Sequence, residues 1–124
     1  MKDKTILIVD DDRYLRDMYS LKFKEHGFHV EESGSVAEAL EKLKGGFVPS
    51  AIVFDVVMPG QDGYAFLDAL SAAGLAHDAV KIALSNQGQD KDVEKAKEKG
   101  ASAYIVKANS VPSEVVSKVL EHLK

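Results

Sequence analysis

The sequence predicts an α/β fold, an open doubly wound sheet of five parallel strands covered by five helices in three layers. Short apolar runs alternate along the chain with amphipathic stretches, as consecutive βα units require. Right-handed crossovers between parallel strands then place helices on both faces of the sheet. Four of the five apolar runs also end on a residue able to handle a phosphoryl group or a metal ion. Parallel sheets bind ligands at the carboxyl ends of their strands, so this pattern agrees with the fold.

The five expected strands are short and mostly apolar. The third is apolar throughout, as a strand covered on both faces should be. The second is the one run that ends without a candidate functional residue. We expect the strands at residues 5–9, 28–30, 50–55, 80–85 and 103–106.

Local signals mark the ends of the first two helices. Residues 13–26 carry apolar side chains at roughly helical period, and Gly27 suits the position that follows a helix. Ser35 and Glu38 form a capping box, which predicts a second helix that ends near residues 45–46.

The later helices differ in their apolar content. Asp62 is placed to cap a helix that is rich in apolar residues, and Pro112 suits the first turn of the last helix. The helix expected at residues 89–99 is nearly all polar, with Val93 and Ala96 as its only apolar residues. It gains little from packing, so we expect it to be loosely held.

Size and composition indicate one domain spanning residues 1–124. With 45% hydrophobic residues, a 124-residue chain can bury one core but not two. The net charge of −4 gives no basic face for nucleic acid, and the lack of cysteine excludes disulfides and thiolate metal sites. No apolar run approaches the roughly 20 residues that a membrane helix needs. We therefore expect a cytoplasmic protein that neither inserts into membranes nor binds nucleic acid directly.

Three consecutive acidic residues, Asp10, Asp11 and Asp12, follow the first strand. One aspartate there could simply complement the helix dipole, and Asp12 is the expected helix cap. Several carboxylates at one strand end, facing Asp55 at the end of another, repel one another unless a cation binds. Mg²⁺ prefers oxygen ligands and is held by one or two carboxylates together with phosphate. The cluster therefore predicts a site for Mg²⁺, which Mn²⁺ can also occupy, with Asp11 as a ligand.

Asp55, Ser85 and Lys107 stand at the ends of the third, fourth and fifth strands. A metal ion and the Lys107 ammonium would keep a buried Asp55 ionised and therefore nucleophilic. A hydroxyl and an ammonium are the donors that the oxygens of a transferring phosphoryl group require. Tyr104, on the last strand, is equally consistent with packing at a sheet edge and with a functional role. The four histidines show no metal-ligand spacing.

Seven short motifs carry a resemblance to a known family. They are ILIVDDD at residues 6–12, VFD at 53–55, Met58-Pro59, Asp62-Gly63, Leu84-Ser85, Gly100-Ala101 and YIVK at 104–107. In order and spacing, over the whole chain, they resemble a response-regulator receiver domain of two-component signalling. The resemblance implies a flavodoxin-like fold with strand order 2-1-3-4-5.

The resemblance also implies the metal and phosphoryl ligands. Asp55 would accept the phosphoryl group and would ligate Mg²⁺. Asp11 would bind the metal directly, and Asp10 would bind it through water. The backbone carbonyl of Val57 would complete the set of protein ligands.

A phosphorylation-dependent switch is the implied function. Lys107 would pair with the phosphoryl group, Ser85 would hydrogen-bond to it, and Tyr104 would be a rotameric switch. A histidine kinase or a phosphotransfer protein would donate the phosphoryl group. A downstream protein would bind through the fourth helix, fifth strand and fifth helix, and phosphorylation could also link two copies in a homodimer. Such a domain catalyses its own phosphorylation and dephosphorylation but does not turn over other substrates. The sequence shows no output domain, so we expect the protein either to act by binding partners or to belong to a longer regulator.

Several residues depart from the family pattern. Ala108 stands where the family usually has a cis proline, and we expect a trans Lys107–Ala108 bond, because a non-proline cis bond costs about 2.5–4 kcal/mol. Asn109 stands where an aromatic residue is common, and Asn86 where a small residue is usual. Val57 and Gln87 occupy positions that tune dephosphorylation in this family. These departures affect the expected rates rather than the chemistry.

Three alternatives share part of this residue set. A magnesium-dependent phosphatase of the haloacid-dehalogenase type uses an aspartate nucleophile with Ser/Thr and Lys, but no acidic pair follows Lys107 and no cap insertion is present. A flavodoxin-like cofactor module needs a phosphate cradle of Ser, Thr and Gly where three aspartates stand. A degenerate receiver, acting only as a binding module, is the third.

Overall fold

The computed structural model describes residues 4–86, 90–107 and 111–123 and has the predicted architecture. Five parallel strands form one sheet in the order β2-β1-β3-β4-β5. The strands are β1 (Lys4–Val9), β2 (Phe28–Ser33), β3 (Ala51–Asp55), β4 (Val80–Ser85) and β5 (Ala103–Val106). The helices are α1 (Arg13–Glu25), α2 (Val36–Lys44), α3 (Gly63–Ala73), α4 (Asp90–Glu98) and α5 (Pro112–Leu123). Within the described ranges, none of them combines the length and apolar character that crossing a membrane requires.

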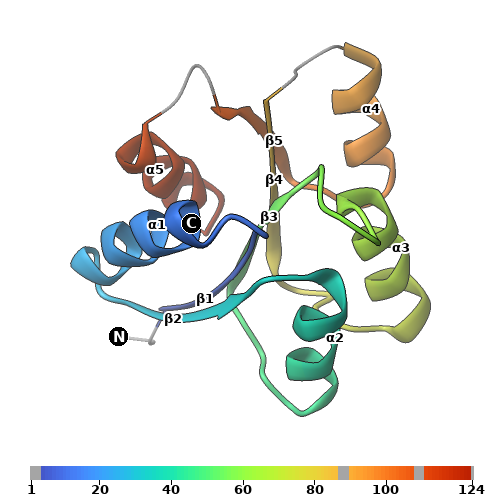
Figure 1. Cartoon of the computed structure of the whole chain (residues 1–124), viewed down its shortest axis with the longest axis horizontal. Helices are drawn as coiled ribbons and strands as arrows, with labels where there is room; N and C mark the ends of the chain where they lie inside the picture. The colour runs from blue at the N-terminus through green and yellow to red at the C-terminus, as the bar shows by residue number, and fades with distance from the viewer. Residues whose placement is uncertain (1–3, 87–89, 108–110, 124) are drawn as a thin grey trace.

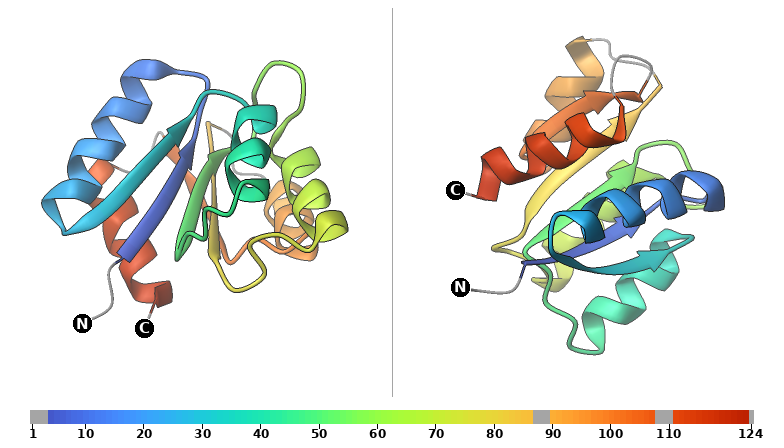
Figure 2. Two further views of the ribbon diagram at one scale, coloured as in Figure 1. Left: turned by 90° about the horizontal axis from the view of Figure 1, so that it is seen from below. Right: turned by 90° about the vertical axis from the view of Figure 1, so that its left-hand side faces the viewer.

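The helices cover both faces of the sheet and complete three layers (Figure 1, Figure 2). α1 and α5 lie on one face, while α2, α3 and α4 cover the other. Under α1 and α5, the rings of Phe23 and Phe28 pack edge to face with centroids 5.0 Å apart. On the other face, Phe54 and Phe66 are 5.6 Å apart. Every residue of β3 is buried, as its unbroken apolar run predicted.

Side-chain caps begin three helices where the sequence predicted them. The side chains of Asp12, Ser35 and Asp62 accept hydrogen bonds from backbone N–H groups in the first turns of α1, α2 and α3. One detail of the predicted capping box differs, since the Glu38 carboxylate accepts from the N–H of Gly34, at 3.2 Å. Each cap marks the residue at which a loop ends and its helix begins. Losing such a cap costs roughly 1 kcal/mol.

β2 is longer than predicted, because it continues for three residues beyond the apolar run and ends at Ser33. The extension carries Glu31 and Glu32, which resemble loop residues in the sequence. An edge strand tolerates such charges, and basic side chains from the helices on both faces pair with them. Lys42 of α2 lies 3.4 Å from Glu31, and Arg16 of α1 lies 3.5 Å from Glu32.

α4 has little apolar packing, as its composition predicted. Among its residues, Ala96 is the one that is buried. Tyr64, at the beginning of α3, supplies two further contacts. Its hydroxyl donates to the carbonyl oxygen of Asp92 at 3.4 Å, and Lys95 Nζ lies 4.3 Å from its ring centroid. Tyr64 therefore attaches α4 to α3 by polar and cation–π contacts, and the Lys99–Asp68 ion pair directly after α4 adds to them, without a broad apolar face.

Some of the sequence predictions concern residues outside the described ranges. The Lys107–Ala108 bond is one of them, and its trans state stays a prediction; the peptide bonds that are described are all trans. Gln87 and Asn109 also lie outside. Asn86 is described and is exposed directly after β4.

Gly63 lies where the loop after β3 meets α3, in contact with backbone. A Cβ at this position would lie 2.8 Å from Val56 Cα and 2.9 Å from the carbonyl oxygen of Asp55. The Gly63 N–H also donates to the Val56 carbonyl oxygen at 2.8 Å. The loop that follows Asp55 is thus held against the first turn of α3.

We predict that Gly63→Ala destabilises the fold by about 1–3 kcal/mol, because the added methyl group overlaps backbone atoms that cannot move independently. The higher helix propensity of alanine offsets only about 1 kcal/mol. Urea unfolding followed by circular dichroism measures the change. Gly45→Ala at the end of α2, where φ is −78°, is the control and should shift stability by less than about 1 kcal/mol. A Gly63→Ala variant as stable as the parent would contradict the prediction.

Candidate functional site

The carboxyl ends of four strands bring the predicted site residues to one edge of the sheet. Asp10 directly follows β1, Asp55 ends β3, Ser85 ends β4 and Lys107 directly follows β5. The strands end at nearly the same level because of the ladder register. Its last pairs are Val9 with Phe54, Asp55 with Leu84, and Ser85 with Val106.

Lys107 joins the two buried carboxylates of the site. Its Nζ lies 3.0 Å from Asp55 Oδ2 and 3.2 Å from Asp10 Oδ2. The side chains are largely withdrawn from water, with exposed fractions of 11% for Lys107 and Asp55 and 2% for Asp10. Charges interact strongly at such low exposure, so the ammonium offsets much of the repulsion between the two carboxylates.

Asp10, Asp11 and Asp55 form a group that can hold a cation, since each places a carboxylate oxygen within 4.8 Å of the others. Asp10 and Asp55 are buried, whereas Asp11 is exposed. Three anionic oxygens fit Mg²⁺, which takes carboxylate oxygens and keeps part of its water shell. The single positive charge of Lys107 cannot neutralise three carboxylates, so the group retains a negative charge that favours a divalent cation.

Backbone N–H groups orient both buried carboxylates. The Asp12 N–H donates to Asp10 Oδ1 at 2.9 Å, and the Val57 N–H donates to Asp55 Oδ1 at 3.1 Å. Each carboxylate therefore has one oxygen on a backbone N–H and the other on Lys107. Val57 lies in the loop after β3 with its side chain exposed.

The pKa values of the site record this competition between burial and charge pairing. Burial raises the pKa of the Asp10 carboxyl above its ordinary 3.8, against the opposing effects of the Asp12 N–H and the Lys107 ammonium. Burial disfavours the Lys107 ammonium too, yet Asp10 and Asp55 outweigh it and raise the pKa of that group. The site thus favours the protonated form of Lys107, whereas it disfavours the ionised form of Asp10.

Ser85 and Tyr104 lie beside this centre on β4 and β5. Ser85 is buried, one residue beyond the point where β4 pairs with Asp55. Tyr104 packs, half-buried, against the core under α2, α3 and α4. Tyr104 also neighbours Tyr64. Burial is the main cause that raises the pKa of the Tyr64 phenol to about 12, and the nearby Tyr104 and Asp92 add to it. This packing is compatible with both roles that the sequence left open for Tyr104.

Two residues near the site were not singled out in the sequence. Arg16 of α1 donates from Nη1 to the carbonyl oxygen of Asp10 at 2.6 Å. Tyr64 joins α3 to α4, as described above. The available signals were an arginine in the first turns of the helix that follows the acidic cluster, and an aromatic residue directly after Asp62-Gly63. Neither signal states which distant partner the side chain meets.

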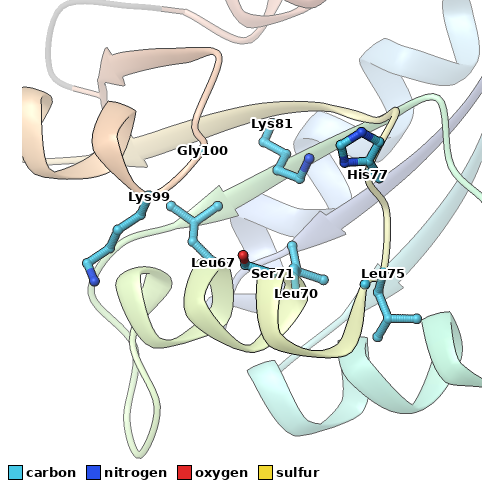
Figure 3. A pocket seen from close by; sticks show the side chains of 9 residues that line it. Leu67, Leu70, Ser71, Leu75, His77, Lys81, Lys99 and Gly100 are labelled. Carbon is cyan, nitrogen blue, oxygen red and sulfur yellow. The ribbon is translucent and has the colours of Figure 1, made fainter.

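A cavity of about 300 Å³ lies apart from this centre, between α3 and the turn after α4 (Figure 3). Leucines of α3 and the side chain of Lys81 line it. Burial lowers the pKa of Lys81, whose Nζ donates to the Ala79 carbonyl oxygen at 3.1 Å. Lys81 lies near the beginning of β4 and Asp55 at the end of β3, so the cavity is at the opposite end of the sheet from the carboxylates.

A parallel five-stranded sheet of order 2-1-3-4-5, with an acidic cluster, a strand-end aspartate and a lysine at one edge, defines a receiver-type module. The chain belongs to the response regulator receiver domain family, whose model matches residues 6–119. Receiver domains act as signalling switches rather than turnover enzymes, and they bind Mg²⁺ at an acidic aspartate cluster. Family membership therefore selects the receiver interpretation over the phosphatase and the cofactor module.

Similar proteins include transcriptional regulators and chemotaxis proteins. The phosphate regulon transcriptional regulatory protein PhoB of Escherichia coli (strain K12) is 28% identical over 116 residues, which cover 94% of this chain and 50% of that protein. The chemotaxis protein CheY of Halobacterium salinarum is 29% identical, with 94% and 97% covered. The crystal structure of a putative response regulator from Chloroflexus aurantiacus is 32% identical, with 98% of both chains covered and a TM-score of 0.87. The chain spans about half the length of the first curated relatives that it matches.

We predict that Asp10→Asn stabilises the protein in Mg²⁺-free buffer, because it removes a buried carboxylate whose charge is disfavoured. With a raised pKa, Asp10 keeps a proton in the folded state that the unfolded chain has released. Stability should therefore fall as the pH rises from 3.8 through the raised pKa of Asp10, and this fall should shrink in Asp10→Asn.

Urea unfolding in EDTA between about pH 4 and pH 7 measures this pH dependence. Asp17→Asn is the control, since Asp17 lies on α1 with a side chain that is 62% exposed. It should leave the pH dependence of stability unchanged. If the stability of Asp10→Asn fell with rising pH as much as that of the parent, the pH dependence could not be assigned to Asp10.

Proposed function

We propose that this receiver domain is a phosphorylation-dependent switch in which Asp55 accepts a phosphoryl group from a histidine kinase or a phosphotransfer protein. The observation that carries the proposal is the Lys107 ammonium, 3.0 Å from Asp55 Oδ2, beside a cluster of carboxylates. A buried carboxylate that a cation keeps ionised is a nucleophile. Residues 1–124 would act as one domain, in the cytoplasm.

In the proposed step, an Asp55 carboxylate oxygen attacks the phosphorus of a phosphoimidazole. The new P–O bond forms as the P–N bond breaks, and the leaving imidazole nitrogen takes a proton from solvent. Lys107 would transfer its hydrogen bond from Asp55 Oδ2 to a phosphoryl oxygen, and the Ser85 hydroxyl would donate to another. Water later hydrolyses the acyl phosphate, which returns Asp55 to its carboxylate form.

The acidic cluster would hold Mg²⁺, or Mn²⁺ in its place, which supplies neutralising charge to the attacking and transferring oxygens. Asp11, Asp55 and the Val57 carbonyl would be direct ligands, and Asp10 would act through water. The hydrogen bonds do not distinguish Asp10 from Asp55, because both oxygens of each carboxylate accept from a backbone N–H and from Lys107; this division follows the family pattern. Asp11 is exposed and free to turn toward the ion.

The output of the switch would appear on the face formed by α4, β5 and α5. A phosphoryl group would draw Ser85 inward, and Tyr104 would rotate toward the vacated space. This biases a pre-existing equilibrium between two states rather than building a new fold. The few apolar contacts of α4 support its movement, and a downstream protein or a second phosphorylated copy would read the result.

We predict that acetyl phosphate with Mg²⁺ adds one acid-labile, hydroxylamine-sensitive phosphoryl group to the protein. Asp55→Asn should add none, because an amide is neither charged nor nucleophilic. Lys107→Ala should still bind Mg²⁺ but should respond poorly to phosphorylation. Intact-mass spectrometry and NMR measure these outcomes.

Asp78→Asn is the matched control, since Asp78 is an exposed aspartate before β4. It should be labelled like the parent. Labelling of Asp55→Asn at the parent's level would place the nucleophile elsewhere. A parent that binds Mg²⁺ yet takes up no phosphoryl group from acetyl phosphate or from any candidate kinase would support the degenerate receiver instead.

We predict that Tyr64→Phe loosens α4 and leaves the labelling of Asp55 unchanged. Phenylalanine keeps the ring beneath Lys95 but loses the hydroxyl that donates to Asp92. Amide hydrogen exchange in α4 should become about two- to tenfold faster, the amount expected for one hydrogen bond. Tyr14→Phe, at an exposed tyrosine of α1, is the control. Unchanged exchange throughout α4 in Tyr64→Phe would show that the hydroxyl does not hold this helix.

A further inference from the structure

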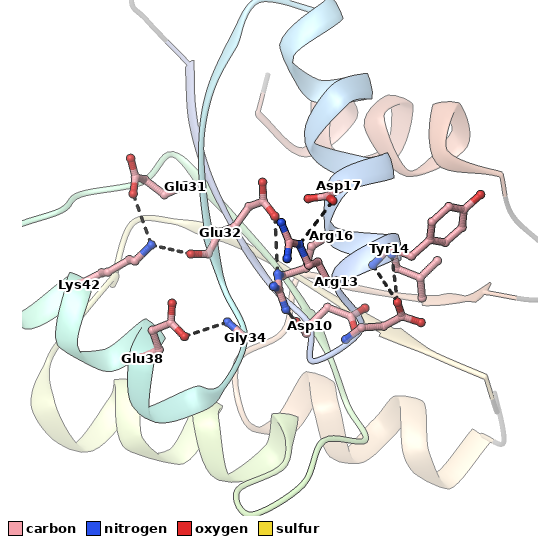
Figure 4. A network of polar contacts seen from close by, with 12 residues as sticks. Asp10, Arg13, Tyr14, Arg16, Asp17, Glu31, Glu32, Gly34, Glu38 and Lys42 are labelled. Carbon is pink, nitrogen blue, oxygen red and sulfur yellow. Dashed lines mark hydrogen bonds and ion pairs between the residues drawn. The ribbon is translucent and has the colours of Figure 1, made fainter.

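The side chain of Arg16 spans the gap between the acidic loop after β1 and the end of β2 (Figure 4). Its Nη1 donates to the Asp10 carbonyl oxygen at 2.6 Å, and its Nε lies 3.5 Å from Glu32 Oε1. The side chain is 18% exposed. Nε is buried and has no hydrogen-bond partner in the described part of the chain, so Glu32 is the group that offsets its charge.

The surroundings of Arg16 are built to hold it in this place. A Cβ on residue 34 would lie 3.1 Å from Arg16 Nη1, so Gly34 leaves the room that the guanidinium occupies. Glu32 is itself held, because Lys42 donates to its carbonyl oxygen from the opposite face of the sheet. The end of β2 is therefore fixed from both faces, and it gives Arg16 a stable anchor.

Arg13 provides the contrast on the same helix. Its side chain is 86% exposed, and its nearest carboxylate, on Asp17, is 3.9 Å away. An ion pair at that exposure contributes little to stability. The two arginines thus share their helix and their charge but differ in burial and in contact with the acidic loop.

We infer that Arg16 is a positioning residue for the metal-binding loop: by holding the Asp10 carbonyl, it fixes the backbone between Asp10 and Asp11 so that their carboxylates converge with Asp55. This inference rests on the metal site of the proposed function. Four hydrogen bonds hold Asp10: its carbonyl oxygen accepts from Arg16, its N–H donates to the Ser33 carbonyl oxygen, and its carboxylate accepts from the Asp12 N–H and from Lys107. The first of them acts directly on the peptide that links Asp10 to Asp11. Without the first, the peptide that carries Asp11 can rotate and the direct ligand leaves the cluster.

If Arg16 positions the loop, removing it should weaken Mg²⁺ binding, whereas electrostatics alone predicts the opposite change in affinity. A guanidinium close to the cluster repels a divalent cation, so its loss should tighten Mg²⁺ binding or leave it unchanged. Loss of positioning should weaken Mg²⁺ binding. The sign of the change in affinity therefore separates the two accounts, and a purely structural role would change only the stability of the metal-free protein.

The experiment is a Mg²⁺ titration of the full chain by NMR, on the parent, Arg16→Gln, Arg16→Lys and the control Arg13→Gln. We expect Arg16→Gln to weaken Mg²⁺ binding by about tenfold, as for other groups that orient metal ligands. Arg16→Lys should recover only part of the affinity, because one ammonium cannot reach both Asp10 and Glu32 as the planar guanidinium does. Arg13→Gln should bind Mg²⁺ as the parent does. Thermal unfolding without metal records stability separately.

Glu32→Gln and the double variant Arg16→Gln/Glu32→Gln complete a double-mutant cycle. If Glu32 acts by anchoring Arg16, the double variant should bind Mg²⁺ no more weakly than Arg16→Gln. Additive losses would mean that Glu32 acts on the metal through its own charge and would overturn the anchoring step. If Arg16→Gln does not fold, Arg16→Lys carries the test.

The outcomes for the inference and for the proposed function are distinct. Binding of Mg²⁺ to Arg16→Gln with the parent's affinity, or more tightly, would overturn the positioning role and leave the metal site intact. A parent that binds no Mg²⁺ would overturn both. Weakening in Arg16→Gln with an unchanged Arg13→Gln would support the positioning role.

Discussion

Every part of the site depends on one electrostatic constraint: the sheet buries more carboxylate charge at its carboxyl edge than its own cations neutralise. Lys107 lies within 3.2 Å of both Asp10 and Asp55, and Asp11 adds a third carboxylate nearby. An uncompensated buried charge costs several kcal/mol. Lys107 can therefore leave Asp55 only when another anion takes its place, and a phosphoryl group on Asp55 would be such an anion. The same excess of negative charge is what makes the edge receptive to a divalent cation.

The fold keeps these charges together by fixing the loops rather than the side chains alone. Asp12 caps α1 and orients Asp10 with its own N–H, so one residue ends the acidic loop and positions its first carboxylate. After β3, the hydrogen bond from the Gly63 N–H to the Val56 carbonyl oxygen holds the loop that carries Val57 near Asp55. Because backbone contacts enforce the geometry, the repulsion among the carboxylates cannot relax by loop movement.

The sequence predicted that the strand-end residues meet at one edge of the sheet, but it did not predict the contacts around them, for a physical reason. Lys107 and Asp10 are 97 residues apart, yet their meeting follows from topology alone, since parallel strands must end at one edge. The contacts of Arg16 with Asp10 and Glu32 depend instead on the direction and rotamer of a long side chain, which periodicity does not specify. β2 was predicted too short for a related reason: Glu31 and Glu32 lie on an edge strand and pair with Lys42 and Arg16, contacts that the sequence pattern does not specify.

The loose attachment of α4 matches the free energy that the site can supply. The Tyr64 hydroxyl bond, the cation–π contact of Lys95 and the exposed Lys99–Asp68 pair are each worth about 1 kcal/mol or less. Moving a two-state equilibrium from 1:99 to 99:1 takes about 5.5 kcal/mol. Hydrogen bonds to a charged group contribute about 1.5–3 kcal/mol each. Lys107 would exchange one anionic partner for another, so the new bond from Ser85 to a phosphoryl group would be comparable with the individual contacts that hold α4. A helix attached by a broad apolar face would cost more free energy to move, so the polar composition of α4 favours the proposed switch.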